Sequence, residues 1–181
     1  QPMGKHAEAA AFASYLEPLR HGESIGVISE AGCPAVADPG AALVEIAQRE
    51  GLKVVPLVGP SSILLSVMAS GFNGQSFAFH GYLPIDGGDR AKALKRYEAR
   101  SAAEDETELF IETPFRNEKL FKEILAACSP KTRLCIAAGL TGDTEFVRTH
   151  TIAQWRSMPA PPINKIPAIF LIYAGGSKGR K

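Results

Sequence analysis

The sequence lacks any apolar run near the length that a membrane-spanning helix needs, which is about 20 residues. Prolines, serines, glycines or charged residues interrupt every apolar stretch sooner. It also lacks an excess of charge of one sign, because 20 lysines and arginines face 19 aspartates and glutamates, for a formal net charge of +1. No global positive field therefore marks a nucleic-acid-binding protein, although a local basic patch stays possible.

Cysteine and histidine are sparse. The three cysteines, Cys33, Cys128 and Cys135, have no metal-ligand spacing and cannot all pair, which favours a reducing cytosol. The four histidines are scattered along the chain, so no metal site is predicted. We expect a cytoplasmic protein with no metal and no membrane partner. The composition, 45% hydrophobic and 22% charged, is typical of a packed globular protein.

Strand-like and helix-like segments alternate along the 181 residues, which predicts an α/β fold with a mostly parallel N-terminal sheet. The polar stretch 72–76 suggests a domain boundary. We expect an N-terminal α/β domain over 1–74, a C-terminal α/β domain over 75–175 and a flexible tail over 176–181. The expected strands are Ile25–Ser29, Leu52–Val58, Phe77–Leu83, Thr107–Glu112, Thr132–Ala138, Glu145–Thr149 and Ile166–Tyr173. The expected helices are Ala7–Leu19, Pro39–Glu50, Ser61–Ser70, Asp89–Ser101, Pro114–Cys128 and Ile152–Ser157.

Two loops of small residues each follow an expected strand. Ser29–Pro34 is closed by Asp38-Pro39-Gly40, and the second loop is Val58–Ser62. Ligands of open α/β sheets bind at the carboxyl ends of strands, and glycine lets backbone approach a ligand closely. The pair of loops therefore predicts a small-molecule pocket walled by backbone.

Each loop also has an ordinary interpretation. At Gly59–Ser62, free N–H groups at a helix start and two hydroxyls would accept a carboxylate or phosphate, yet serine is a common helix cap. Glu30 would accept ribose hydroxyls or face a cationic ligand group, or it is a solvated loop acid. Cys33 as a nucleophile is the weaker interpretation, because cysteine is commonly a small buried residue.

Basic residues suggest anion contacts. Arg116 is predicted in the first turn of a helix, where a cation opposes the helix dipole, so it either holds a substrate phosphate or pairs with an acid such as Glu112 or Glu118. Four cations share one face of the expected helix 89–101 and would touch a phosphate backbone or face solvent. They are Lys92, Lys95, Arg96 and Arg100. At the start of the last expected strand, Ala168 follows Pro167. Because its side chain is small, a flat ring of a ligand would be able to lie on the backbone there. The alternative is ordinary packing of the strand.

In sequence order, these motifs resemble the tetrapyrrole methylase superfamily of S-adenosylmethionine-dependent methyltransferases. The resemblance is greatest to the branch that contains ribosomal RNA small subunit methyltransferase I, and it runs from about Ile25 to Ala174. The matching motifs are Ser-Glu-Ala-Gly-Cys-Pro with Asp-Pro-Gly, Val-Gly-Pro-Ser-Ser, Ser-Gly with Phe-Ala-Phe-His-Gly-Tyr-Leu-Pro, and Glu-Thr-Pro-Phe-Arg.

The resemblance implies two α/β domains, the second with a mixed sheet, and S-adenosyl-L-methionine in the cleft between them. It also implies a homodimer and, as acceptor, a ribose 2′-hydroxyl of ribosomal RNA, with Arg116 toward the substrate. It assigns no catalytic residue. The family's first strand and its turn would precede Gln1. The implied cofactor-binding residues are Ser29, Glu30, Ala31, Gly32, Pro34, Gly59, Pro60, Ser61, Ser62, Leu140, Thr141, Pro167 and Ala168.

The sequence departs from the branch at three places. Glu30 replaces an aspartate, Cys33 replaces a threonine, and Gly139-Leu140-Thr141-Gly142 replaces Glu-Leu-Thr-Lys. Two alternatives therefore stay open. One is methyl transfer to a tetrapyrrole or to another small-molecule or protein acceptor. The other is a non-catalytic homologue that binds RNA.

Overall fold

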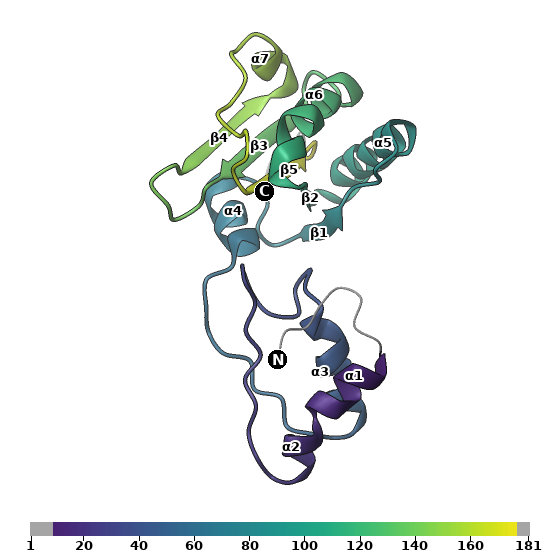
Figure 1. The fold of residues 1–181 in the computed structure, drawn as a ribbon. Helices are drawn as coiled ribbons and strands as arrows, with labels where there is room; N and C mark the ends of the chain where they lie inside the picture. The colour runs from purple at the N-terminus through teal and green to yellow at the C-terminus, as the bar shows by residue number, and fades with distance from the viewer. Residues whose placement is uncertain (1–8, 177–181) are drawn as a thin grey trace. The chain divides into compact units, whose positions relative to one another are not determined.

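The computed structural model describes residues 9–176 and contains two compact units, one up to Ser61 and one from Ser62 on (Figure 1). Helix α4 (Ser62–Ser70) belongs to the second unit and packs against strands of its sheet. The sequence assigns residues 62–74 to the first domain instead, and that division stays a prediction for the whole protein. The start of the expected helix 7–19 and the expected tail beyond Gly176 lie outside the described residues.

The second unit is built on a five-stranded mixed sheet with the order β1-β2-β5-β3-β4 (Figure 1). Its strands are β1 (Phe77–Tyr82), β2 (Thr107–Ile111), β3 (Arg133–Ala138), β4 (Phe146–Thr151) and β5 (Ala168–Tyr173). β1 and β2 are parallel, whereas the pairs β2–β5, β3–β5 and β3–β4 are antiparallel. The mixed α/β architecture predicted from the sequence is thus confirmed, and the five strands lie within one or two residues of their expected positions.

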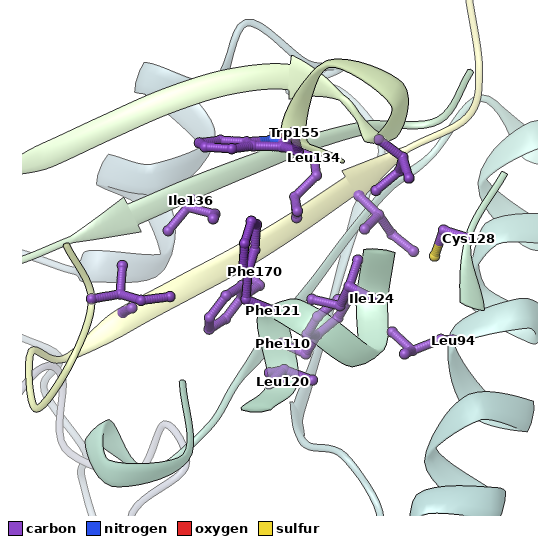
Figure 2. Close-up of a cluster of buried hydrophobic side chains, with 14 of the residues drawn as sticks. Leu94, Phe110, Leu120, Phe121, Ile124, Cys128, Leu134, Ile136, Trp155 and Phe170 are labelled. Atoms are coloured by element: carbon purple, nitrogen blue, oxygen red, sulfur yellow. Dashed lines mark hydrogen bonds between the residues drawn. The ribbon is translucent and has the colours of Figure 1, made fainter. Parts of the chain in front are cut away.

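Strand β5 is buried along its whole length because both faces of the sheet are covered. Phe170 and Ile172 join the cluster under α5 (Gly87–Glu104), α6 (Asn117–Ala127) and α7 (Ile152–Arg156) (Figure 2). Ile169 and Leu171 point to the other face, where they pack with Val67 of α4. A strand that is buried on both faces reads as one continuous apolar run, as this segment does.

Local signals fix the helix starts of this unit. Asp86 accepts a hydrogen bond from the Asp89 amide at 2.9 Å and caps α5. Thr151 and Gln154 form a capping box at α7. The helix expected over 114–128 is divided, because η1, a 3₁₀ turn over Pro114–Arg116, precedes α6.

Strand β1 contains an irregularity that explains its Phe-His-Gly-Tyr motif. The register with β2 shifts between Phe79 and Tyr82, and Gly81 takes a φ of 65°. Glycine tolerates this left-handed conformation. His80, at the same bulge, stacks on the ring of Tyr97 and pairs with the buried carboxylate of Glu108.

The first unit contains α1 (Ala9–Tyr15), α2 (Glu17–Arg20) and α3 (Gly40–Arg49). α1 and α3 share a small apolar cluster whose buried members are Phe12, Leu16, Leu43, Ile46 and Ala47. Gly51 ends α3 with a φ of 69°, and the Leu52 amide donates to the Ala47 carbonyl at 2.9 Å. This is the Schellman ending that the glycine predicts.

The strands expected at Ile25–Ser29 and Leu52–Val58 are wrong for this structure. Both segments are irregular, and within the described residues neither belongs to a sheet. Val27 and Val54 still turn inward onto the α1–α3 cluster, whereas Ile28 and Leu57 are about nine-tenths exposed, at 90% and 88%. The alternation of side chains is therefore present, but no described segment supplies the hydrogen bonds of a sheet, and the parallel N-terminal sheet is absent from the described residues.

Within the described residues, no helix combines the length and the apolar character that crossing a bilayer requires. All three cysteines are free. Burial raises the pKa of the Cys128 thiol to about 12 and that of Cys135 to about 11. Since thiolates are the reactive form, neither of these two buried thiols is suited to nucleophilic chemistry.

Candidate functional site

The loop that follows residue 29 is organised by the side chain of Asp38. Its Oδ1 accepts hydrogen bonds from the amides of Ala35, at 3.1 Å, and Gly40, at 2.8 Å. Its Oδ2 accepts the Ser29 hydroxyl at 2.9 Å. The carboxylate therefore joins the first residue of the loop to the first residue of α3.

These hydrogen bonds also set the charge of Asp38. Partial burial alone would raise its pKa, but the bonds from Ala35, Gly40 and Ser29 outweigh burial and hold the pKa below its ordinary value. A carboxylate that stays ionised keeps the loop closed across the neutral pH range.

Within the first unit, the Ser29–Pro34 loop lies beside residues 58–61 of the second loop. The thiol of Cys33 donates to the carbonyl of Pro60 with a sulfur–oxygen distance of 3.5 Å. Both residues belong to the same compact unit. The expectation that these loops are neighbours thus agrees with the geometry, and Cys33 links them.

The loops present open backbone. Gly32 has a φ of 72°, and a Cβ placed there or at Gly59 would meet no atom within 4 Å. The Glu30 side chain is exposed. The hydroxyls of Ser61 and Ser62 form no hydrogen bond with any residue between 9 and 176. Free donors and open glycine backbone are suited to a ligand with carboxylate and hydroxyl groups.

A second group of predicted site residues lies together in the second unit, at the end of the sheet where β3 ends and β5 begins. Ala138 and Ala168 are register partners, and the Gly139 amide donates to the Pro167 carbonyl at 2.9 Å. Leu140 and Thr141 follow Gly139 directly. We call this set, residues 139–141 with 167–168, the cofactor edge, after the role that the resemblance implies for it.

The backbone at the cofactor edge is strained. Thr141 has a φ of 66°, an unusual conformation for a β-branched residue. Its amide donates to Glu145 Oε2 at 2.7 Å, which holds the turn. Gly139 has a φ of 58°, and a Cβ there would lie 2.8 Å from the Thr144 carbonyl oxygen, so only glycine fits. Strain of this kind is concentrated at functional sites.

A buried amide connects the cofactor edge to α6. Asn117 is fully buried, and its Nδ2 donates to the Ile166 carbonyl at 2.7 Å and to the Ile163 carbonyl at 3.3 Å. The Lys165 amide donates to the Pro114 carbonyl at 3.2 Å, and Lys165 has a φ of 60°. The segment before Pro167 is therefore fixed by η1 and α6.

Arg116 lies at this edge but has an acidic partner. Its Nε and Nη2 donate to Glu112 Oε1 at 3.0 and 2.7 Å. Glu112 is buried, and its other oxygen lies 4.0 Å from the buried guanidinium of Arg90. The structure thus realises the ion pair that the sequence left open. The Arg116 side chain is still 38% exposed, and its Nη1 makes no hydrogen bond to a described residue.

The basic face of α5 is divided. Arg100 Nε lies 2.7 Å from Glu106 Oε1, and Lys92 pairs with Asp89 at 3.0 Å. Arg96 lies over the ring of Tyr97. Lys95 has no ion-pair partner in the described part of the chain.

Sequence reasoning missed one residue that shapes the site, Asn117, which anchors the segment before Pro167. It named Cys33 but not its link to Pro60, and it named Glu112 as one of the two possible partners of Arg116. Nothing in the sequence marks Asn117, whose partners lie almost fifty residues away.

Comparisons with known proteins agree with this geometry. The family described as Tetrapyrrole (Corrin/Porphyrin) Methylases matches residues 2–155. Two curated relatives carry the name ribosomal RNA small subunit methyltransferase I. The relative from Mesorhizobium japonicum is 34% identical over 148 residues, 82% of this chain and 49% of its own length. The relative from Vibrio cholerae is 32% identical over 149 residues, which are 82% of this chain and 50% of the relative's own length. The chain spans about half the length of these relatives.

Solved structures give the same fold. The methyltransferase CobJ superimposes with a TM-score of 0.63 at 18% identity, covering 100% of this chain and 76% of the other. The cobalt precorrin-4 methyltransferase CbiF superimposes with a TM-score of 0.56 at 17% identity, and the match covers 93% of this chain and 72% of the CbiF chain. The predicted resemblance is confirmed: this chain belongs to the tetrapyrrole methylase family.

Proposed function

We propose that this chain is part of an S-adenosyl-L-methionine-dependent methyltransferase that acts on ribosomal RNA. The single observation that carries the proposal is the pairing of the Ser29–Pro34 loop with the Gly59–Ser62 loop through Cys33 and Pro60. Family membership and the names of the curated relatives support it.

When bound, S-adenosylmethionine supplies a methyl group on an activated sulfonium. We propose that the finer acceptor is a ribose 2′-hydroxyl, so that a carbon–oxygen bond forms as the carbon–sulfur bond breaks, S-adenosylhomocysteine leaves and the hydroxyl proton is lost to a base. No residue of this chain is assigned as that base. The task of the chain is to align the reactants, which is worth roughly 7–11 kcal/mol in well-oriented reactions.

We propose a role for each part of the site. The backbone around Gly32 and Gly59 and the hydroxyls of Ser61 and Ser62 bind the polar groups of the cofactor. Glu30 accepts hydrogen bonds from its ribose hydroxyls, a task that needs only a carboxylate, so its replacement of aspartate is tolerated. The remaining members of the two loops are Ser29, Ala31, Pro34 and Pro60.

At the cofactor edge, we propose that adenine lies on the backbone of Leu140, Thr141, Pro167 and Ala168. Thr141 is held by Glu145, and the segment before Pro167 is held by Asn117. The strained turn and this anchoring fix the backbone before the ligand arrives. Pre-ordered backbone lowers the entropy lost on binding.

Arg116 is our proposed substrate contact. Glu112 orients its guanidinium while Nη1 stays open to a phosphate oxygen of the RNA. The buried carboxylate thus acts through the arginine as a positioning group. We also propose that the whole protein is cytoplasmic and a homodimer, as the resemblance implies.

Titration calorimetry with S-adenosylhomocysteine tests the cofactor. We expect heat of binding that falls in Ser61→Ala and in Gly32→Val, and that is unchanged in Gly22→Val, a matched glycine with positive φ and open space outside the loops. An absence of heat at about 1 mM ligand, or equal losses in all three variants, would refute the assignment.

Transfer of a labelled methyl group from S-adenosylmethionine tests the acceptor. The full-length protein is offered small ribosomal subunits in one reaction and a precorrin in another. Label in the ribosomal RNA, resistant to alkaline hydrolysis at one ribose, is the expected result. Label in the precorrin would move the chain to tetrapyrrole chemistry. RNA binding with no transfer and no calorimetric heat would make it a non-catalytic RNA-binding homologue.

A further inference from the structure

A hollow of about 630 Å³ lies at the end of the sheet opposite the cofactor edge. Here β3 begins at Arg133 and β5 ends at Tyr173, and these two residues are register partners. Helix α5 and the segment 129–132 complete its walls. We call this hollow the basic groove. Because both strands are six residues long, it lies about 17–20 Å from the cofactor edge.

Three cations line the basic groove: Lys95 on α5, Lys131 in the loop before β3, and Arg133 at the start of β3. None of them forms an ion pair with a carboxylate in the described part of the chain. The side chains of Lys95 and Lys131 are exposed. Their charge is therefore available to a ligand rather than neutralised within the protein.

The guanidinium of Arg133 is held by aromatic rings. Its central carbon lies 4.6 Å from the centroid of Tyr173 and 5.2 Å from that of Phe72. The two rings stack on each other with their centroids 5.3 Å apart. Cation–π contacts of this kind fix the plane of the guanidinium and leave its N–H donors free. Arg133 is thus pre-oriented to bind a phosphate.

The acids near the groove are engaged in its walls. Glu98 Oε1 accepts the Ser129 amide at 2.7 Å and also the hydroxyl of Thr132. Asp105 binds the hydroxyl of Tyr173. These carboxylates brace the walls, so positive charge predominates where the hollow opens.

We propose that the basic groove binds the sugar–phosphate backbone of the RNA substrate. Cations from α5 and from the start of β3 are suited to successive phosphates of a strand rather than to one phosphate group. Phosphate contacts set the position of a nucleic acid without reading its sequence. This proposal rests on the RNA-directed function proposed above. An RNA that contacts both Arg116 and the groove would cross the second unit along its strands.

The test is the affinity of a fluorescein-labelled, single-stranded RNA of about 30 nucleotides, measured by fluorescence anisotropy at several salt concentrations. In Lys95→Glu/Lys131→Glu we expect binding to weaken about tenfold or more. The slope of log affinity against log salt should fall by about 1.4, since each single-strand phosphate contact contributes about 0.7. Lys95→Arg/Lys131→Arg should keep wild-type affinity.

The matched control is Lys53→Glu/Lys122→Glu, which makes the same charge change at two exposed lysines outside the groove. It should bind RNA within about twofold of wild type. Equal weakening in both reversals, or wild-type affinity in Lys95→Glu/Lys131→Glu, would overturn the groove while leaving the proposed function intact. If the wild-type protein binds no RNA, the groove and the RNA substrate both fail, and calorimetry with S-adenosylhomocysteine still decides the methyltransferase assignment.

Discussion

Similar apolar segments form a strand in the second unit of this chain but not in the first. Val54-Val55 in the first unit and Leu171-Ile172 in the second are both β-branched or aliphatic stretches that read as strands. In the second unit, β5 has hydrogen-bonded neighbours on both sides and helices over both faces. In the first, the corresponding segments have one apolar cluster beneath them and no described ladder. Apolar pattern selects which face is buried, but a strand forms only where a partner supplies its hydrogen bonds.

The largest test of this contrast is a matched pair of leucines. Leu171 is fully buried in β5, whereas Leu57 is 88% exposed. Leu171→Ala should lower the free energy of unfolding by about 2–5 kcal/mol, because it leaves a cavity in a covered sheet. Leu57→Ala should change it by less than about 0.5 kcal/mol. Urea denaturation measures both, and equal losses would show that the two units are packed alike.

The next largest effect on the free energy of unfolding is expected at Glu112, a buried acid of the second unit. Glu112→Gln removes the carboxylate that binds Arg116, whereas Arg90 keeps its closer partner Glu123 at 2.6 Å, and we expect a loss of about 1.5–3 kcal/mol. Glu118→Gln makes the same change in charge at an exposed position and should be neutral. Thermal unfolding of both variants checks this. A neutral Glu112→Gln would mean that the pair does not stabilise the edge.

In the first unit, the corresponding acid is Asp38, and its contribution depends on pH. Its folded-state pKa is lowered, so the stabilisation is present above the unfolded value, about 3.9, and is lost as pH falls through the folded pKa. Asp38→Asn removes the charge and one of the two acceptor oxygens, so it should speed amide exchange of Gly40 at pH 7. The difference from wild type should shrink as the pH falls below about 4. A difference that stays constant below that pH would rule out the charge as its cause.

The smallest expected effect is an increase in the free energy of unfolding. Thr141 holds a left-handed conformation that asparagine adopts more readily, so Thr141→Asn should raise the free energy of unfolding by up to about 1 kcal/mol. Thr144→Asn, on the same exposed turn but without a positive φ, should give no gain. Denaturation curves of the two variants decide whether the cofactor edge stores strain.

Sequence reasoning placed the second unit well because its signals are local and agree with its packing. The continuous apolar run of β5 matches burial on both faces. The helix expected over 39–50 begins and ends within one residue of α3. Sequence reasoning failed at Ile25–Ser29 and Leu52–Val58, because strand pairing depends on a partner that propensity does not reveal.

In the candidate site, too, local sequence signals were informative and contacts between distant residues were not predicted. The two small-residue loops were predicted from glycine, proline and small residues, which mark positions where backbone turns or approaches a ligand, whereas Leu140 and Thr141 were predicted only from the family resemblance. The contacts that hold these segments were not predictable from the sequence. Cys33 and Pro60 are 27 residues apart, and Asn117 and Ile166 are 49 apart. Only the folded chain brings such pairs together, so no local pattern announces them.

The most direct test of the central claim is a backbone NMR map of the ¹⁵N-labelled protein titrated with S-adenosylhomocysteine. The account predicts shifts of the amide signals of Gly32, Gly59, Thr141 and Ala168, with the signals of the basic groove, such as Lys131, unmoved. Shifts confined to the basic groove, or none at about 1 mM ligand, would contradict it.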